Sequence, residues 1–239
     1  MLDMDMGAME SLDTAIRMEL VRPEEVEYAK HFIPDSIADE PPEPEKGASE
    51  AVVERFKQDA EKRYKDAAAL LVRFRDDYYS ALEEAEKVHG SISIDPSNKL
   101  WMLVSAVKVH EAAVKRSRRN DNRFVDRRDY GMANHLMEGL IARSLSYPHV
   151  NSLWTMRSAV KFNGNSEAKE FHGGKEFVAY EPVGFKFTDA IVQAVLQLED
   201  WGTEGIVAVV RSSRQNRDLT GQVIYSPDYD TIRAFVLGR

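Results

Sequence analysis

Apolar residues recur every seven positions between Val53 and Val88, and most residues between them are polar or charged. Two rows make up the pattern: Val53, Ala60, Ala67, Phe74, Ala81 and Val88, and, four positions along, Tyr64, Leu71, Tyr78 and Ala85. This spacing predicts one long helix with a narrow apolar seam. No proline or glycine interrupts the chain between Ser49, a suitable N-cap, and Gly90, which we expect to end the helix.

The seam favours an antiparallel partner helix at close approach. Alanine at three positions of the first row leaves room for a neighbouring backbone, and Lys57 stands where the second row should begin, which argues against a parallel zipper. Two amphipathic stretches follow, at about residues 96–118 and 126–146. We therefore expect a long antiparallel helical hairpin or bundle, with self-association through the seam as the second interpretation.

Composition divides the chain into four parts. We predict an N-terminal helical arm (1–33), an acidic Pro-rich linker (34–47), a helical domain (48–150) and a small α+β domain (151–239). The linker contains four prolines and five acids, which leave no means of forming a helix or a strand. Further along the chain we predict short strands at 91–94 and 176–180, a loop at 164–174, a helix at 189–201 and a β-hairpin from 206–211 and 222–225. The expected fold class is α-rich α+β.

Composition also limits the classes of function. The 239 residues carry a net charge of −8 and include no cysteine, which excludes disulfides, thiolate zinc sites and a cysteine nucleophile. Acids interrupt the N-terminus, and the apolar runs are far shorter than a membrane span. We expect a soluble cytoplasmic protein, or a virion component if the chain is viral, and no membrane partner.

A basic cluster stands out in this acidic chain. Between Lys108 and Arg128, eight basic residues accompany three acidic ones, a local charge of +5. Arginine suits phosphate because its planar fork donates two hydrogen bonds at once. We predict nucleic-acid contacts at Lys115, Arg116, Arg118, Arg119, Arg123, Arg127 and Arg128, and at Arg211, Arg214 and Arg217 of the hairpin. The alternatives are an acidic protein partner, or solubility and pairing with the chain's own acidic linker.

Arg128, Asp129 and, six residues beyond Asp129, His135 form a second candidate. They resemble the Arg–polar–His motif of HEPN-type ribonucleases, a resemblance that covers eight residues. It implies a helical protein in which Arg128 and His135 face the RNA backbone and support attack by a 2′-hydroxyl. The alternative is a helix-start arginine and a histidine beside the core.

No other motif in the sequence predicts catalysis or a cofactor. The sequence has no phosphate-binding Gly-Lys-Ser/Thr, no dinucleotide Gly-x-Gly-x-x-Gly and no Gly-x-Ser-x-Gly elbow. His135 and Glu138, one turn apart, have no matching second pair, so we expect no metal. The leading prediction is a non-catalytic assembly or adaptor protein, of the viral or phage structural kind. Its partners would be other protein subunits, including copies of itself, and RNA, DNA or an acidic partner at the basic surface. The alternative is a nucleic-acid-binding module in its own right.

Overall fold

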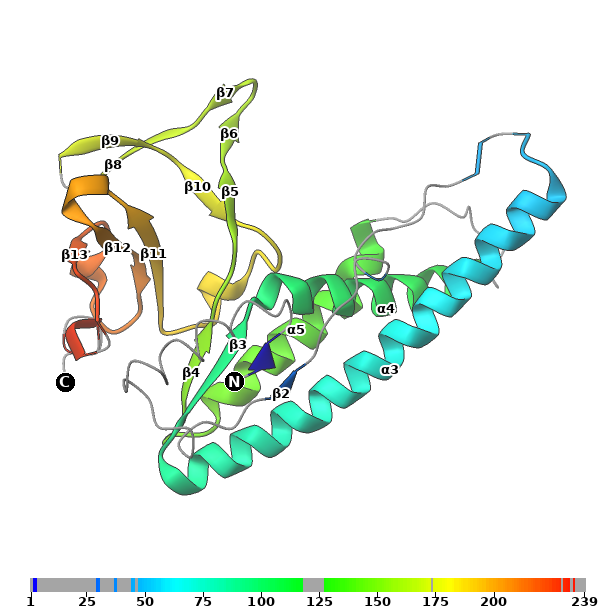
Figure 1. Cartoon of the computed structure of the whole chain (residues 1–239), viewed down its shortest axis with the longest axis horizontal. Helices are drawn as coiled ribbons and strands as arrows, with labels where there is room; N and C mark the ends of the chain where they lie inside the picture. The colour runs from blue at the N-terminus through cyan, green and yellow to red at the C-terminus, as the bar shows by residue number, and fades with distance from the viewer. Residues whose placement is uncertain are drawn as a thin grey trace. The chain divides into compact units, whose positions relative to one another are not determined.

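The chain folds as two compact units, Met1–Arg157 and Ser158–Arg239, called here the first and second units. The computed structural model describes residues 2–3, 29–30, 37, 44–45, 47–117, 127–172, 174–228, 230–232 and 234 (Figure 1). Its elements are a long helix, shorter helices and small sheets, so the fold is a mixed α+β one, as the sequence predicted.

The predicted long helix is confirmed as α3 (Glu50–Val88). Its buried side chains are Ala67, Leu71, Phe74, Tyr78, Leu82 and Ala85. The seam residues from Ala67 to Ala85 are buried, apart from the half-buried Ala81, and Val88 at the end of the helix is exposed. In the first half, Val53, Ala60 and Tyr64 are half-buried.

The ends of α3 differ in detail from the expectation. Ser49 precedes the helix and its carbonyl accepts the Val52 and Val53 N–H groups, but its hydroxyl makes no capping hydrogen bond. At the other end His89, rather than Gly90, takes the left-handed conformation, with φ 54°. The Gly90 N–H donates to the Ala85 carbonyl at 2.7 Å, which satisfies a carbonyl of the last turn.

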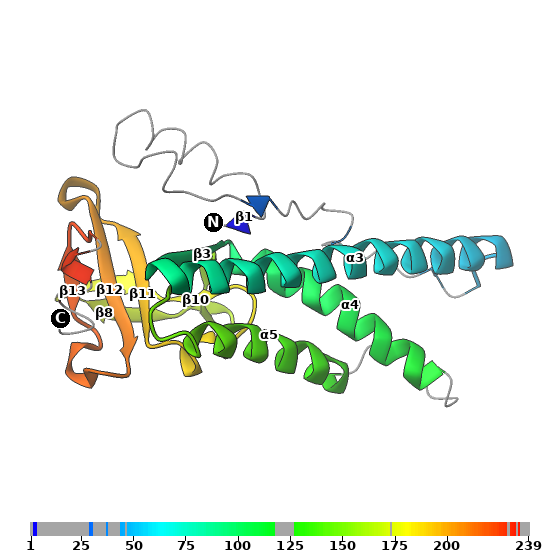
Figure 2. The same ribbon diagram turned by 90° about the horizontal axis from the view of Figure 1, so that it is seen from below.

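Two more helices lie close to the predicted ranges: α4 (Ser97–Ser117) and α5 (Tyr130–Leu145), the latter preceded by the 3₁₀ turn η2 (Arg127–Asp129). Helix α4 contacts both α3 and α5 (Figure 2). The buried residues of these two helices include Leu100, Leu103, Val104, Val107, Ala133, Met137, Leu140 and Ile141. Together with the seam of α3, they form the apolar core of the first unit.

A parallel sheet joins these helices. Its strands are β1 (Leu2–Asp3), β2 (Ala29–Lys30), β3 (Ser91–Asp95) and β4 (Asn151–Trp154), in the order β2-β1-β3-β4. Helices α4 and α5 form the crossover between β3 and β4 that parallel strands require. Residues 151–157 belong to the first unit because β4 pairs with β3, whereas the sequence boundary was drawn after residue 150.

Two short strands lie within the range predicted to be an N-terminal helical arm. Leu2 pairs with Ala29 and with Ile94, so strands occupy both described pieces of the arm. The hydrogen-bonding edge of β3 accounts for this difference, because it imposes an extended conformation on β1. The rest of 1–33, and the linker apart from residues 37, 44, 45 and 47, lie outside the described residues.

The second unit contains an antiparallel sheet of β11 (Ala194–Asp200), β12 (Ile206–Ser213) and β13 (Val223–Tyr225). The pairing of β12 with β13 confirms the predicted hairpin, and η5 (Arg217–Leu219) lies in its connection. The predicted helix 189–201 is wrong. Only η3 (Thr188–Ala190) is helical there, since residues 194–200 alternate in side-chain direction and pair along β12. A 3₁₀ turn, η4 (Gly202–Glu204), connects the two strands.

Three two-stranded ribbons precede this sheet, where the sequence predicted a loop at 164–174. They are β5 (Ser158–Val160) with β10 (Tyr180–Pro182), β6 (Phe162–Asn163) with β7 (Ser166–Glu167), and β8 (Lys169–His172) with β9 (Lys175–Val178). Gly164, with φ 66°, and Gly174, with φ 80°, stand in the two-residue turns of the last two ribbons. The two glycine-bearing segments therefore specify hairpin turns rather than a loop.

Candidate functional site

The ten residues predicted to contact nucleic acid are spread over different parts of the chain. Arg118, Arg119 and Arg123 lie outside the described residues. Arg116 is in the last turns of α4, and Arg127 begins η2. The side chains of Lys115, Arg128, Arg214 and Arg217 are exposed. Arg211 lies in a network of side-chain hydrogen bonds within the second unit.

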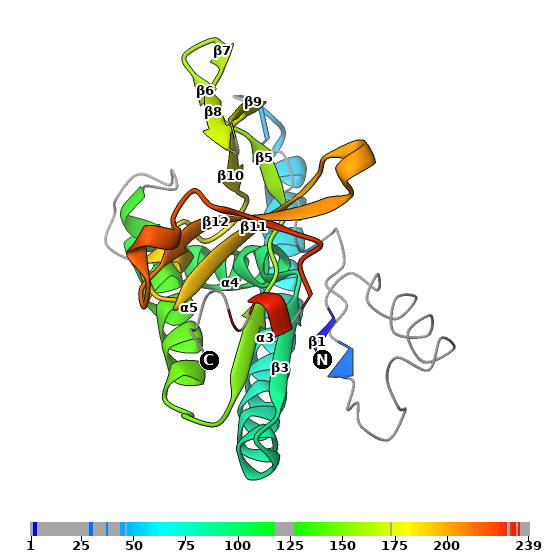
Figure 3. The same cartoon turned by 90° about the vertical axis from the view of Figure 1, so that its left-hand side faces the viewer.

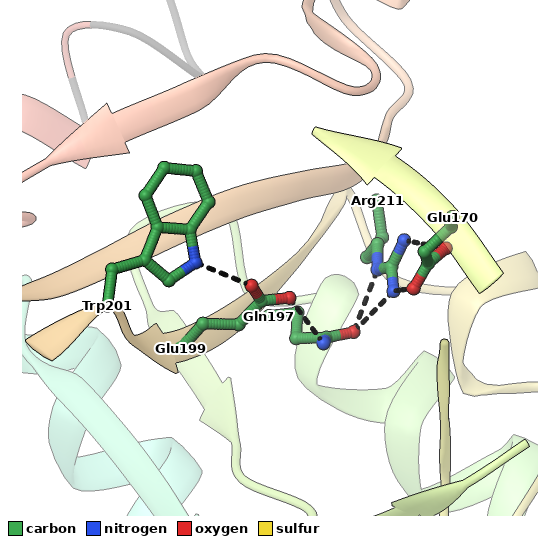
Figure 4. Close-up of polar contacts among 5 residues, drawn as sticks. All are labelled: Glu170, Gln197, Glu199, Trp201 and Arg211. Carbon is green, nitrogen blue, oxygen red and sulfur yellow. Dashed lines mark hydrogen bonds and ion pairs between the residues drawn. The ribbon is translucent and has the colours of Figure 1, made fainter. Parts of the chain in front are cut away.

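Arg211 is held by an acid and an amide rather than presented to solvent (Figure 4). Its Nη1 donates to Glu170 Oε2 at 2.6 Å, and its Nη2 contacts the other carboxylate oxygen. Its Nε donates to Gln197 Oε1 at 2.8 Å. The Arg211 and Glu170 side chains are 22% and 25% exposed. This fork-to-fork geometry is the strong form of an ion pair, so the guanidinium is already occupied.

The network continues along β11. Gln197 Nε2 donates to Glu199 Oε1 at 2.7 Å, and Trp201 Nε1 donates to Glu199 Oε2 at 2.8 Å (Figure 4). The Trp201 ring stacks on Phe177 of β9, with centroids 4.7 Å apart. We call Glu170, Arg211, Gln197, Glu199 and Trp201 the polar clamp.

The polar clamp attaches one ribbon to the sheet of the second unit. Glu170 and Phe177 are cross-strand partners in the β8–β9 ribbon, so they lie on one face of it. On that face, Glu170 pairs with Arg211 of β12, and Phe177 stacks on Trp201, which follows β11. Each carboxylate of the clamp receives two donors. The polar clamp therefore has a structural role, because its hydrogen-bond donors and acceptors are matched to one another.

The three ribbons meet at a small backbone junction. The Lys161 N–H donates to the Ala179 carbonyl at 2.8 Å, the Ala179 N–H to the Ala168 carbonyl at 2.7 Å, and the Ala168 N–H to the Lys161 carbonyl at 2.8 Å. These hydrogen bonds form a closed triangle, with one bond at the base of each ribbon. Ala168 and Ala179 are both buried, which explains why small residues stand where three chains converge.

The faces of the ribbons away from the clamp expose aromatic side chains. Phe162 on β6 is 58% exposed and Phe171 on β8 is 69% exposed. Figure 3 shows the β6–β7 ribbon extending beyond the β11–β12–β13 sheet of its own unit. The sequence analysis missed Phe171 because it assigned residues 164–174 to a loop, and it assigned no element to Phe162. The alternation of apolar and polar residues around the turn glycines is the signal that would have identified them.

The Arg128 and His135 pair lies on the surface of the first unit. Arg128 is part of η2 and has an exposed side chain. His135, on α5, is 78% exposed, and its Nδ1 lies 3.5 Å from Glu138 Oε2 on the next turn. In the described part of the chain, the histidine thus faces solvent and its own helix rather than an enclosed site.

A half-buried polar contact joins α3 to α4. The Tyr64 ring stacks on His110 with centroids 4.5 Å apart, and Glu61 Oε2 lies 3.6 Å from His110 Nε2. The Tyr64 hydroxyl lies 3.5 Å from Glu111 Oε1, which also pairs with Lys108. Burial, followed by the Glu111 carboxylate, raises the pKa of Tyr64.

Among the residues that the structure describes, no three His, Asp or Glu side chains gather in an arrangement for a metal ion. No helix in the described ranges combines the length and the apolar character needed to cross a bilayer.

No protein-family model, curated protein or solved structure matches this chain.

Proposed function

We propose that the protein is a non-catalytic assembly subunit that contacts other copies of itself through the ribbons of its second unit. The observation that carries this proposal is the exposure of Phe162 and Phe171 on ribbons of only two strands. The sequence pattern supports it as well, since it predicts an architectural rather than a catalytic protein.

A two-stranded ribbon has little stability of its own in water. The β6–β7 ribbon has two residues in each strand, and its one large apolar side chain, Phe162, is mostly exposed. Fully burying a phenylalanine contributes about 1.5–3 kcal/mol, so covering Phe162 and Phe171 would supply stabilisation that the ribbons lack alone.

The charges of the ribbons favour a protein partner over a polyanion. Lys169 pairs with Glu176 at 3.0 Å, and the carboxylate of Glu170 is neutralised within the polar clamp. A phosphate-binding surface would instead carry a surplus of cations. The proposal includes the helical hairpin expected from the sequence, with α3 and α4 joined at Tyr64 and His110 as a rigid support for assembly.

Self-association tests this proposal directly. We expect light scattering after size exclusion to give wild-type masses that rise above 27.2 kDa with protein concentration. The double variant Phe162→Ser with Phe171→Ser should stay at the monomer mass. Leu198→Ser is a matched control, because Leu198 is 65% exposed on β11, away from the ribbons. A wild-type monomer at every concentration would overturn the proposal, as would equal loss of association in the control.

Nucleic-acid binding is the second candidate, favoured by Arg214 and Arg217, whose exposed side chains stand three residues apart in the β12–β13 connection. If they bind phosphate, labelled RNA or DNA should bind more weakly as salt rises from about 50 to 200 mM. Arg214→Glu with Arg217→Glu should then abolish binding, while Lys186→Glu, an exposed control in the same unit, should weaken it little. Binding that ignores both salt and the double variant would contradict this candidate.

A further inference from the structure

The three-stranded sheet of the second unit has two edges of different character. β13 forms one edge, has three residues, and is followed by Ser226, with φ 48°, and by Pro227. A short strand that ends in a bend and a proline limits pairing with a further strand. β11 forms the other edge and has seven residues (Figure 1). Among the described residues, no strand pairs with the outer side of β11.

The outer side of β11 presents backbone groups in a regular order. The Val210 N–H of β12 donates to the Gln222 carbonyl at 3.0 Å, so the backbone groups of Val210 point away from β11. Leu196 stands opposite Val210, and in an antiparallel pair its N–H and carbonyl therefore point away from β12. The alternation of the strand gives Leu198 and Asp200 the same direction. The open edge thus offers the N–H and carbonyl groups of these residues to a further strand.

β11 lacks the features with which proteins protect such an edge. Lysine, proline and a bulge on the edge strand are common forms of protection. The strand reads Ala-Val-Leu-Gln-Leu-Glu-Asp, without lysine or proline. Its pairing with β12 is irregular between Val195 and Leu196, but the extra residue there, Arg211, belongs to β12. From Leu196 to Asp200 the pairing is regular, so this stretch can accept an additional strand.

The side chains along this edge define the segment that fits it. Leu196, Leu198 and Asp200 lie on one face of the sheet, and Leu198 is 65% exposed. Apolar side chains opposite the two leucines would bury apolar surface that solvent now covers. Residues 194–205 contain three acids and no lysine or arginine. A cation opposite Asp200 complements this charge.

We propose that the outer edge of β11 binds an extended, basic segment of a partner protein as an additional antiparallel strand. Antiparallel pairing continues the pattern of the sheet and is slightly more stable per residue than parallel pairing. Backbone hydrogen bonds to Leu196, Leu198 and Asp200 supply the affinity, and the side chains opposite them supply the specificity. The inference goes beyond the proposed self-association, which uses Phe162 and Phe171 of the ribbons.

A designed peptide tests the site through its backbone. The probe is fluorescein-labelled Lys-Thr-Val-Thr-Val, which in antiparallel register places its lysine opposite Asp200 and its valines opposite Leu198 and Leu196. The valine N–H groups then point toward β11, and the threonine N–H groups point away from it. We expect saturable binding, measured by fluorescence polarisation. N-methylation of both valines should weaken binding at least about tenfold, whereas N-methylation of both threonines should weaken it less than about threefold.

Variants of the protein locate the peptide on this edge. Leu198→Pro removes an outward N–H without removing a donor from the β11–β12 ladder, because proline is tolerated on edge strands, and it should abolish binding. Leu198→Ser keeps that N–H and should weaken binding less than about tenfold. Circular dichroism checks that both variants fold, and the N-methylated peptides test the same hydrogen bonds on the wild-type protein. Asp200→Lys should reverse the preference between this peptide and one with glutamate in place of its lysine.

Amide hydrogen exchange followed by NMR shows what covers the edge in the free protein. The Leu196 and Leu198 amides should exchange quickly and slow at least about tenfold when the peptide binds. The Gln197 amide, which points toward β12, should be slow in both states. Slow exchange of the two outer amides in the free monomer would show that the chain covers its own edge. Slowing with protein concentration would show that a second copy covers it.

Either of these exchange results would overturn the proposal. So would equal binding of the two N-methylated peptides, because the backbone of the partner would then not pair with β11. Equal binding of the lysine and glutamate peptides to the wild-type protein would contradict the basic character of the segment. Self-association through Phe162 and Phe171 is measured separately by light scattering, so either conclusion can fail without the other.

Discussion

The helical core of the first unit and the ribbons of the second unit are held by different kinds of interaction. Phe74, Tyr78 and Leu82 of α3 are fully buried among apolar side chains of α4 and α5. The ribbons instead depend on a triangle of backbone hydrogen bonds and on the Arg211–Glu170 pair. Apolar burial tolerates some repacking, whereas the ribbons depend on a few directional contacts. Substitutions in the two regions should therefore differ in size and in extent.

The largest effect is expected in the seam. Phe74→Ala leaves a cavity in the core of the first unit and should lower its free energy of unfolding by about 3–5 kcal/mol. Urea denaturation followed by far-UV circular dichroism measures the change. Val72→Ala is the control, because Val72 is on the same helix and largely exposed, and it should cost less than about 1 kcal/mol. Similar losses in the two variants would show that the seam is not the main source of stability.

Breaking the polar clamp should have a smaller and local effect. Arg211→Ala leaves Glu170 partly buried without its cation, at a cost of about 2–3 kcal/mol, lower than for a fully buried pair. Amide hydrogen exchange should quicken in β8 and β9 and stay unchanged in α3. The exposed Arg214→Ala is the matched control and should alter neither region. Unchanged exchange in Arg211→Ala would mean that the clamp does not fix the ribbon.

Overpacking the junction should cost somewhat less. Ala179→Leu places three additional carbon atoms where the ribbons converge, and we expect a loss of about 1–2 kcal/mol. Exchange should then quicken in all three ribbons together, because each one hydrogen-bonds to the triangle. Quickening confined to the β5–β10 ribbon would contradict the description of the junction as one unit.

The smallest effect concerns Tyr78, whose hydroxyl donates to the Leu140 carbonyl at 2.9 Å. Tyr78→Phe should cost about 1 kcal/mol at neutral pH. Burial raises the pKa of Tyr78, so its neutral form is favoured in the folded state. The associated stability is complete below the ordinary pKa of about 10 and is lost as the pH rises above it, because the unfolded chain ionises first. Stability curves of wild type and variant should therefore converge above about pH 10. A constant gap would contradict this linkage.

The difference between the helical core and the ribbons also explains which elements could be predicted from the sequence. Helix α3 was predicted almost to the residue, because a seven-residue apolar rhythm without glycine or proline has one simple interpretation. Strand β11 was mistaken for a helix, since Ala194–Asp200 has no strong β signal apart from its alternation. Its conformation depends on pairing with β12, a long-range interaction that local propensity does not contain.

The candidate site shows a similar division. Sequence reasoning selected arginines by type, but it could not distinguish Arg211, which binds Glu170 from a distant strand, from Arg214 and Arg217, which are exposed. Glu170 and Arg211 are 41 residues apart, and no spacing rule links them. The hydrogen bond from Arg63 to the Ile37 carbonyl was equally hidden, because the linker was interpreted by its composition alone.

The backbone triangle at the base of the ribbons limits how the length of a ribbon can change. Side chains alternate between faces, so inserting one residue into β8 would move Glu170 away from Arg211, whereas adding two residues to each strand would keep every face. The β6–β7 ribbon is free of the polar clamp and ends in a glycine turn. Lengthening it by such pairs would move its tip outward by about 7 Å each time, at about 3.4 Å per residue. Under the proposed assembly function, the length of this ribbon would set the separation between one subunit and the partner that its tip contacts.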